Sequence, residues 1–185
     1  MGTRGFVSFV ADGQAKTAYN HCDSYPSGLG ADVLSWLQSA DLEAAKEKAQ
    51  ALRLVDDEVE PTDADIERLR PSYNPSVGER SERPTWYQLL RETQGNPGAM
   101  LAAGVIEDAS EFPADSLFAE WGYVVDFDAQ VFEVYVGFQS RPHGEGRFAA
   151  MPRVREDYAP VRLIKSWPLA ELPPSLGDLE GDDED

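Results

Sequence analysis

The chain has 185 residues, of which 42% are hydrophobic and 10% aromatic, and its formal net charge is −18. This size suits a single domain with a core of its own. No stretch approaches the roughly 20 apolar residues that a membrane-spanning helix needs, and the N-terminus lacks the apolar core and cleavage site of a secretion signal. The single cysteine excludes an internal disulfide. We therefore expect a cytoplasmic protein with no membrane contact.

The acidic residues gather in two runs. Segment 56–67 carries seven acidic residues and no basic one, and segment 178–185 carries six and no basic one. This charge repels nucleic acid, because binding to phosphate groups needs Lys and Arg. It favours solubility and attracts basic proteins. We predict no direct nucleic-acid binding and a possible basic protein partner, and we leave the oligomeric state open.

The N-terminal region predicts a β-hairpin. Residues 5–10 are apolar and β-prone, and the pair Asp12-Gly13 favours a tight turn. Residues 15–20 then return as a second strand. The hairpin ends at the motif YNHCDSYPSGLG, residues 19–30.

The middle of the chain predicts helices. Apolar residues between 29 and 40 recur on one helical face. Asp41 can cap a second helix over residues 42–55. Further helices are expected to begin at capping residues, at Thr62, Thr85 and Asn96.

The clearest β pattern lies in segment 120–138, where two β-rich arms flank a short polar turn. A last strand is predicted over residues 159–167. This order of strands, helices and strands indicates an α+β fold. We predict a mostly antiparallel sheet built from the N-terminal and C-terminal hairpins and packed by several helices from the middle of the chain. Residues 1–170 would form one domain, and residues 171–185 an acidic, disordered tail.

The motif at residues 19–30 concentrates chemically active side chains. If the strand continues through Asp23, then Tyr19, His21 and Asp23 share one face, and Asn20 and Cys22 share the other. A carboxylate beside His21 would orient the imidazole as a general base, or the two side chains would supply two metal ligands.

A structural interpretation of the motif stays open. Asn, Asp and Ser near a strand end satisfy backbone groups, Tyr25-Pro26 sets a turn, and the glycines permit unusual backbone angles. We predict no cofactor and no metal site, and we assign no catalytic residue. The predicted ligand- or partner-binding residues are Tyr19, Asn20, His21, Asp23 and Tyr25.

Two other segments allow a functional and a structural interpretation. Asp126 and Asp128 flank Phe127 in the second hairpin, where they could bind a cation or form the turn. The Arg-rich segment 146–156 could bind an anion or pair with the protein's own acidic runs. We favour the structural interpretation of both.

The stretches MGTRGFVSF, YNHCDSYPSGLG, DSLFAEWGYVVDFD and FEVYVG together resemble an uncharacterised protein family found in bacteriophages and actinobacteria. The resemblance covers most of the chain and implies no known activity. The family motif keeps the residues at His21 and Asp23 and varies at Cys22. The resemblance therefore implies that any mechanism does not depend on the cysteine.

A second likeness is to the N-terminal-nucleophile hydrolases, which also begin with a strand, a tight turn and a second strand. Those enzymes need Ser, Thr or Cys as the first residue after processing, whereas removal of Met1 leaves Gly2. We predict a phage-type binding or regulatory protein that acts on a protein partner. The alternative is a hydrolase centred on His21 and Asp23, either metal-assisted or N-terminal-nucleophile-like, so whether the protein is an enzyme stays open.

Overall fold

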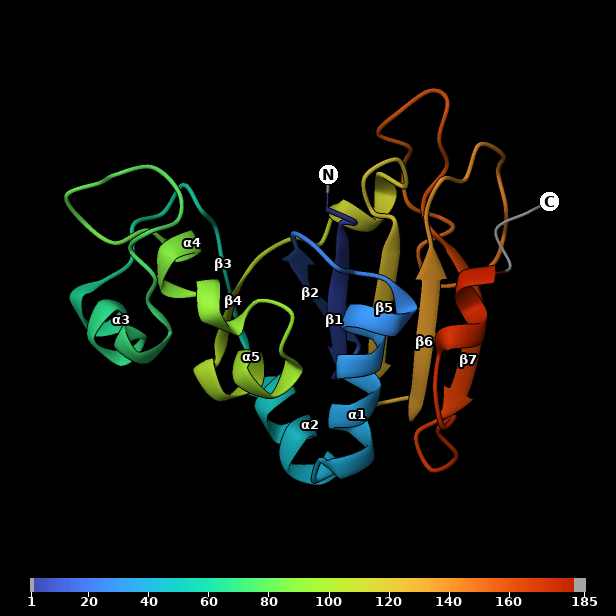
Figure 1. Cartoon of the computed structure of the whole chain (residues 1–185), viewed down its shortest axis with the longest axis horizontal. Helices are drawn as coiled ribbons and strands as arrows, with labels where there is room; N and C mark the ends of the chain where they lie inside the picture. Colours follow the sequence, from blue (N-terminus) through green and yellow to red (C-terminus); the bar gives the residue numbers. More distant parts are fainter. Residues whose placement is uncertain (1, 182–185) are drawn as a thin grey trace.

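The computed structural model describes residues 2–181 and has an α+β fold, with a five-stranded sheet and helices from the middle of the chain (Figure 1). The sheet has the order β2-β1-β5-β6-β7. Its neighbouring strands are antiparallel except β1 and β5, which are parallel. The prediction of a mostly antiparallel sheet from the two terminal hairpins is confirmed. The strands of the sheet are β1 (Gly5–Ala11), β2 (Gln14–Asn20), β5 (Trp121–Asp126), β6 (Val131–Val136) and β7 (Arg162–Pro168).

The two parallel strands form the buried centre of the sheet. Every residue of β1 and β5 is buried, as expected of strands covered on both faces. Alternate side chains divide between two apolar clusters. Val7 and Phe9 belong to the cluster shared with α1 and α2, and Phe6 and Val10 belong to the cluster shared with Phe148 on the other face.

The helices begin at the residues that the sequence indicates. The side chains of Asp41 and Asn96 accept backbone N–H groups, and Thr62 and Thr85 form capping boxes. The α-helices are α1 (Ala31–Ser39), α2 (Leu42–Ala51), α3 (Asp63–Arg68), α4 (Trp86–Leu89) and α5 (Pro97–Ala103). Short helical turns of other types are η1 (Pro26–Gly30), η2 (Arg70–Ser72), η3 (Arg91–Thr93), η4 (Phe112–Ala114) and η5 (Gly177–Gly181).

The predicted helix over residues 42–55 is wrong in its last turn. Helix α2 ends at Ala51, and β3 (Arg53–Val55) follows and pairs in parallel with β4 (Val105–Glu107). The buried Lys16 Nζ donates to the carbonyl oxygens of Ala49 and Gln50, at 2.9 and 2.8 Å, and so satisfies the end of the helix. A distant strand therefore supplies the hydrogen bonds that another helical turn would have made.

Part of the segment that we expected to be a disordered tail packs on the domain. Leu176 and Leu179 are buried, and the Ser27 N–H donates to Glu180 Oε1 at 2.6 Å. The last tail residues, 182–185, lie outside the described residues. Across residues 2–181, no helix combines the length and apolar character needed to cross a membrane.

Candidate functional site

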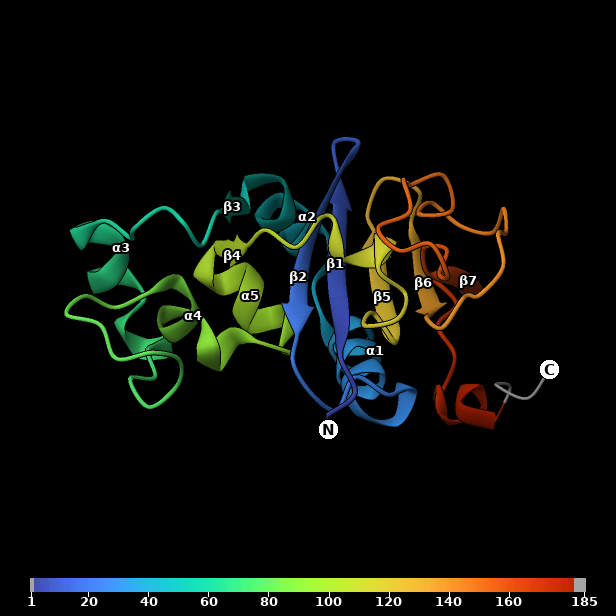
Figure 2. The same cartoon turned by 90° about the horizontal axis from the view of Figure 1, so that it is seen from above.

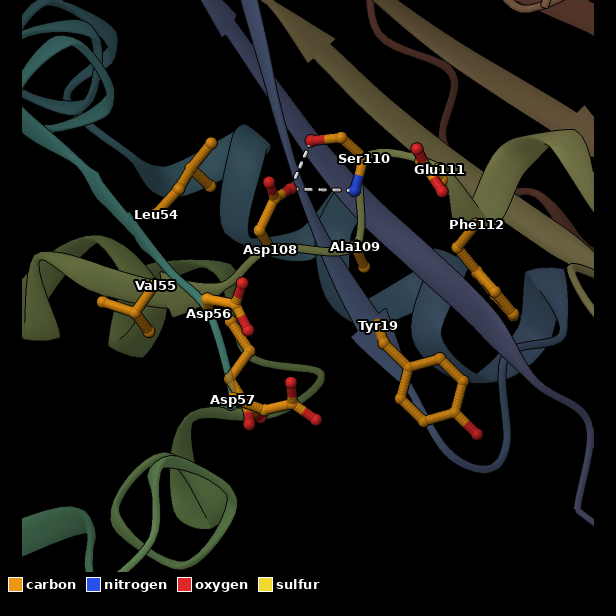
Figure 3. Close-up of a pocket in the computed structure, with 11 residues that line it drawn as sticks. Tyr19, Leu54, Val55, Asp56, Asp57, Asp108, Ala109, Ser110, Glu111 and Phe112 are labelled. Carbon is orange, nitrogen blue, oxygen red and sulfur yellow. Dashed lines mark hydrogen bonds between the residues drawn. The ribbon is translucent and has the colours of Figure 1, made fainter. Parts of the chain in front are cut away.

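A cleft of about 610 Å³ opens beside the end of β2 (Figure 3). Tyr19 and Phe112 form an aromatic wall, with their rings edge to face at a centroid distance of 5.1 Å. The end of β3 and the segment that follows β4 supply the other wall. No Lys, Arg or His lines the cleft among the described residues. Its carboxylate side chains are Asp56, Asp57, Glu107, Asp108 and Glu111.

Strand pairing brings these acidic residues together. Val55 is aligned with Glu107 in the β3–β4 pair, and the Asp108 N–H donates to the Val55 carbonyl oxygen at 2.9 Å. The Ala109 N–H then donates to the Thr17 carbonyl oxygen of β2, also at 2.9 Å. The cleft is therefore built by three segments that are far apart in the sequence, and Figure 2 shows β3 and β4 next to each other on the side of β2 away from β1.

Glu107 is the most perturbed carboxyl group of the cleft. Burial, and then the negative charge of Asp57, raise its pKa to about 7. Asp108 is engaged within its own turn, because its carboxylate accepts the N–H of Ser110 at 2.9 Å and also the Ser110 hydroxyl (Figure 3). The concentration of like charge, with no basic side chain in the lining, gives the cleft a potential that attracts cations.

The structure separates the predicted site residues. Tyr19 lines the cleft, and its hydroxyl lies 3.0 Å from Nδ1 of the exposed His21. Asn20 is buried and points the other way, where its amide donates to the carbonyl oxygen of Cys22 and to Oγ of Ser24, at 2.6 and 2.8 Å. Of the predicted set, the structure therefore joins Tyr19 and His21 but not Asn20.

The assumption that the strand continues through Asp23 is wrong. Strand β2 ends at Asn20, and Asp23 has a left-handed φ of 54°. No ion pair joins His21 to Asp23 in the part of the chain that the structure describes. The strand face on which these two side chains were expected to meet is therefore not formed.

Backbone contacts explain the rest of the motif as a corner. The Asp23 carbonyl oxygen accepts the Leu29 N–H at 2.8 Å, and the Tyr25 carbonyl oxygen accepts the N–H groups of Gly28 and Gly30. The buried Ser24 donates its N–H to the Thr3 carbonyl oxygen. Tyr25 is 41% exposed and does not line the acidic cleft.

A smaller hollow of about 290 Å³ lies on the Asn20 side of the corner. Its lining includes Asn20, the exposed Cys22 and Asp23. Arg91 of η3 also lines it. Residues 2–181 contain no group of three or more His, Cys, Asp or Glu side chains arranged to hold a metal ion.

Sequence reasoning missed half of the acidic cleft. It identified the acidic run that contains Asp56 and Asp57, but it did not connect this run with Glu107, Asp108 and Glu111. The available signal was the acidic segment directly after the short apolar stretch at residues 105–106. This segment becomes part of the cleft only through the pairing of β3 with β4, two strands about 50 residues apart in the sequence.

Comparison with known proteins found no matching protein-family model, no matching curated protein and no matching solved structure. The function of the acidic cleft is therefore inferred from its own residues.

Proposed function

We propose that this protein is a binding protein of regulatory type that holds a basic segment of a protein partner in the acidic cleft. The observation that carries the proposal is the cleft itself, which combines about 610 Å³ of open volume with five acidic residues and no basic one in its lining. The phage origin implied by the sequence resemblance is part of the same proposal.

The two walls of the cleft suit different parts of a basic side chain. The aromatic wall of Tyr19 and Phe112 can pack against the apolar stem of Lys or Arg, or against the planar guanidinium group. The carboxylates of Asp56 and Asp57 can then pair with the cationic end. Contacts between such charges favour fast association and are weakened by salt.

The test uses an unstructured peptide in which Arg and Lys alternate with Gly and Ser, with binding followed by fluorescence anisotropy at low and high salt. The double variant Asp56→Asn/Asp57→Asn should weaken binding by about tenfold or more. The matched control, Glu43→Gln/Glu47→Gln, removes the same charge from exposed positions of α2 and should change the affinity less than about twofold.

Equal losses in the two double variants would contradict the proposal, because they would show that the peptide responds only to net charge. Binding that does not change with salt would also contradict it. Circular dichroism of each variant shows that a loss of affinity does not come from a loss of fold.

A further inference from the structure

A second surface presents aromatic rings and guanidinium groups. Phe118 is 38% exposed and Phe138 is 55% exposed. The guanidinium groups of Arg4 and Arg155 lie over the Phe118 ring, at 4.8 and 4.7 Å from its centroid. These four residues are called the aromatic–arginine patch below. Exposed aromatic and Arg side chains are enriched in protein interfaces.

The backbone holds Phe138 on the surface in an unfavourable conformation. Its φ of 56° lies in the left-handed region, which bulky side chains rarely adopt. The Phe138 N–H donates to the Ser116 carbonyl oxygen at 2.6 Å, and the Gln139 N–H donates to Ser116 Oγ at 3.1 Å. These bonds also join Phe138 to the segment that carries Phe118. A strained residue with an exposed ring indicates that this surface has a use.

One chain segment connects the acidic cleft to the aromatic–arginine patch. The segment after β4 lines the cleft as far as Phe112, passes through η4 and then supplies Phe118 to the patch. Arg4 has no carboxylate partner within 4.0 Å among the ion pairs of residues 2–181. Arg155 is already paired with Asp115 at 2.6 Å, so Arg4 is the side chain of the patch that can supply a cation to another surface.

We propose that this face binds a second copy of the chain, with the cleft of each copy facing the aromatic–arginine patch of the other. A two-fold contact requires a surface that is complementary to itself, and an acidic cleft joined by one segment to a surface that carries the cation of Arg4 meets this requirement. The rings of Phe118 and Phe138 supply apolar contact area. Arg4 of each copy supplies a cation to the acidic cleft of the other. This inference does not depend on the proposed binding of a basic partner.

Sedimentation velocity of the full chain over a concentration series tests the proposal, and a reversible dimer is expected. Phe138→Gly removes the ring and suits the left-handed φ, so the variant should fold and should dimerise at least about tenfold more weakly. The matched control is Val59→Ala, at an apolar residue that is 61% exposed outside the patch, and it should dimerise as the unmodified chain does.

A charge exchange tests the pairing itself. Arg4→Asp and Asp57→Arg should each weaken the dimer, and the double variant should regain it because each copy again presents opposite charges. Three results would overturn the proposal. The unmodified chain could sediment as a monomer at every concentration. The Phe138→Gly variant could dimerise as the unmodified chain does, or the double variant could stay monomeric. The basic-peptide measurement is made on dilute protein, so its outcome is independent of the dimer.

Discussion

Gly30 shows why part of the motif at residues 19–30 is fixed by packing. A Cβ atom at this position would lie 2.8 to 2.9 Å from the ring and hydroxyl of Tyr123. The Tyr123 side chain is fully buried, and its hydroxyl donates to the Ser24 carbonyl oxygen at 2.9 Å. The glycine therefore allows the corner to rest directly on β5.

Gly30→Ala should lower the free energy of unfolding by about 1–3 kcal/mol, because the Tyr123 ring has no space into which to move. Chemical denaturation measures the change. Gly144→Ala is the matched control, since no atom lies within 4 Å of an added Cβ there. A Gly30→Ala variant as stable as Gly144→Ala would show that the contact with Tyr123 is looser than described.

Glu107 makes the stability of the protein depend on pH. Its pKa rises from 4.5 to about 7 on folding, so the folded state holds a proton that the unfolded state has released between these values. Stability should therefore fall as the pH rises through this window.

Glu107→Gln should remove this dependence. The free energy of unfolding of the variant should equal that of the unmodified protein near pH 4.5. Near pH 8 it should be higher by about 1–2 kcal/mol. Solvent around the partly exposed carboxylate makes this difference smaller than the pKa shift alone would give. Denaturation at a series of pH values gives the comparison. Parallel pH profiles for the two proteins would exclude a perturbed Glu107.

Local chemistry was the most predictable feature at the residue scale. The caps at Asp41, Thr62, Thr85 and Asn96 were predicted and are confirmed, because a cap depends on side chains within three residues. The orientation of Asp23 was not predictable in this way. Its left-handed φ accompanies a hydrogen bond from Leu29, which depends on how the corner folds as a whole.

At the scale of elements, ion pairs fasten the Arg-rich segment 146–156 to the rest of the domain. The Arg147 guanidinium donates to the carboxylates of Asp126 and Glu133, at 2.6 and 2.8 Å. Arg155 pairs with Asp115 at 2.6 Å. The prediction that the Arg-rich segment pairs with the two acidic runs is wrong for these two side chains, because their partners Asp126, Glu133 and Asp115 lie outside both runs.

Arg147→Met should lower the free energy of unfolding by about 2–4 kcal/mol, because it leaves two mostly buried carboxylates without their cation. Arg70→Met breaks an exposed pair with Glu67 and should cost less than about 1 kcal/mol. Thermal or chemical denaturation of both variants provides the measurement. Similar losses in the two variants would contradict the structural role of Arg147.

The long-range pairing of elements was only partly predictable. The two terminal hairpins have alternating apolar residues and turn signals of their own, so the sequence indicated both. The parallel contact between β1 and β5 joins residues more than 100 positions apart, and β3 and β4 have three residues each. Such short strands carry no periodic signal, and the acidic cleft that they create was therefore hidden in the sequence.

At the scale of the whole molecule, charge is concentrated rather than spread evenly. The net charge of −18 was visible in the sequence, but the fold alone brings the acidic residues of two segments into one cleft. This arrangement predicts that a basic ligand recognises one place on the surface instead of the entire acidic exterior.

An NMR titration of the dilute, isotopically labelled chain with the Arg- and Lys-containing peptide shows whether a basic ligand selects the acidic cleft. We expect saturable shifts of the backbone amides at residues 54–57 and 107–112, with small changes at the other exposed acidic positions, such as Glu43 and Glu47 on α2. Shifts of equal size on α2 and around the cleft, or shifts that never saturate, would contradict this expectation.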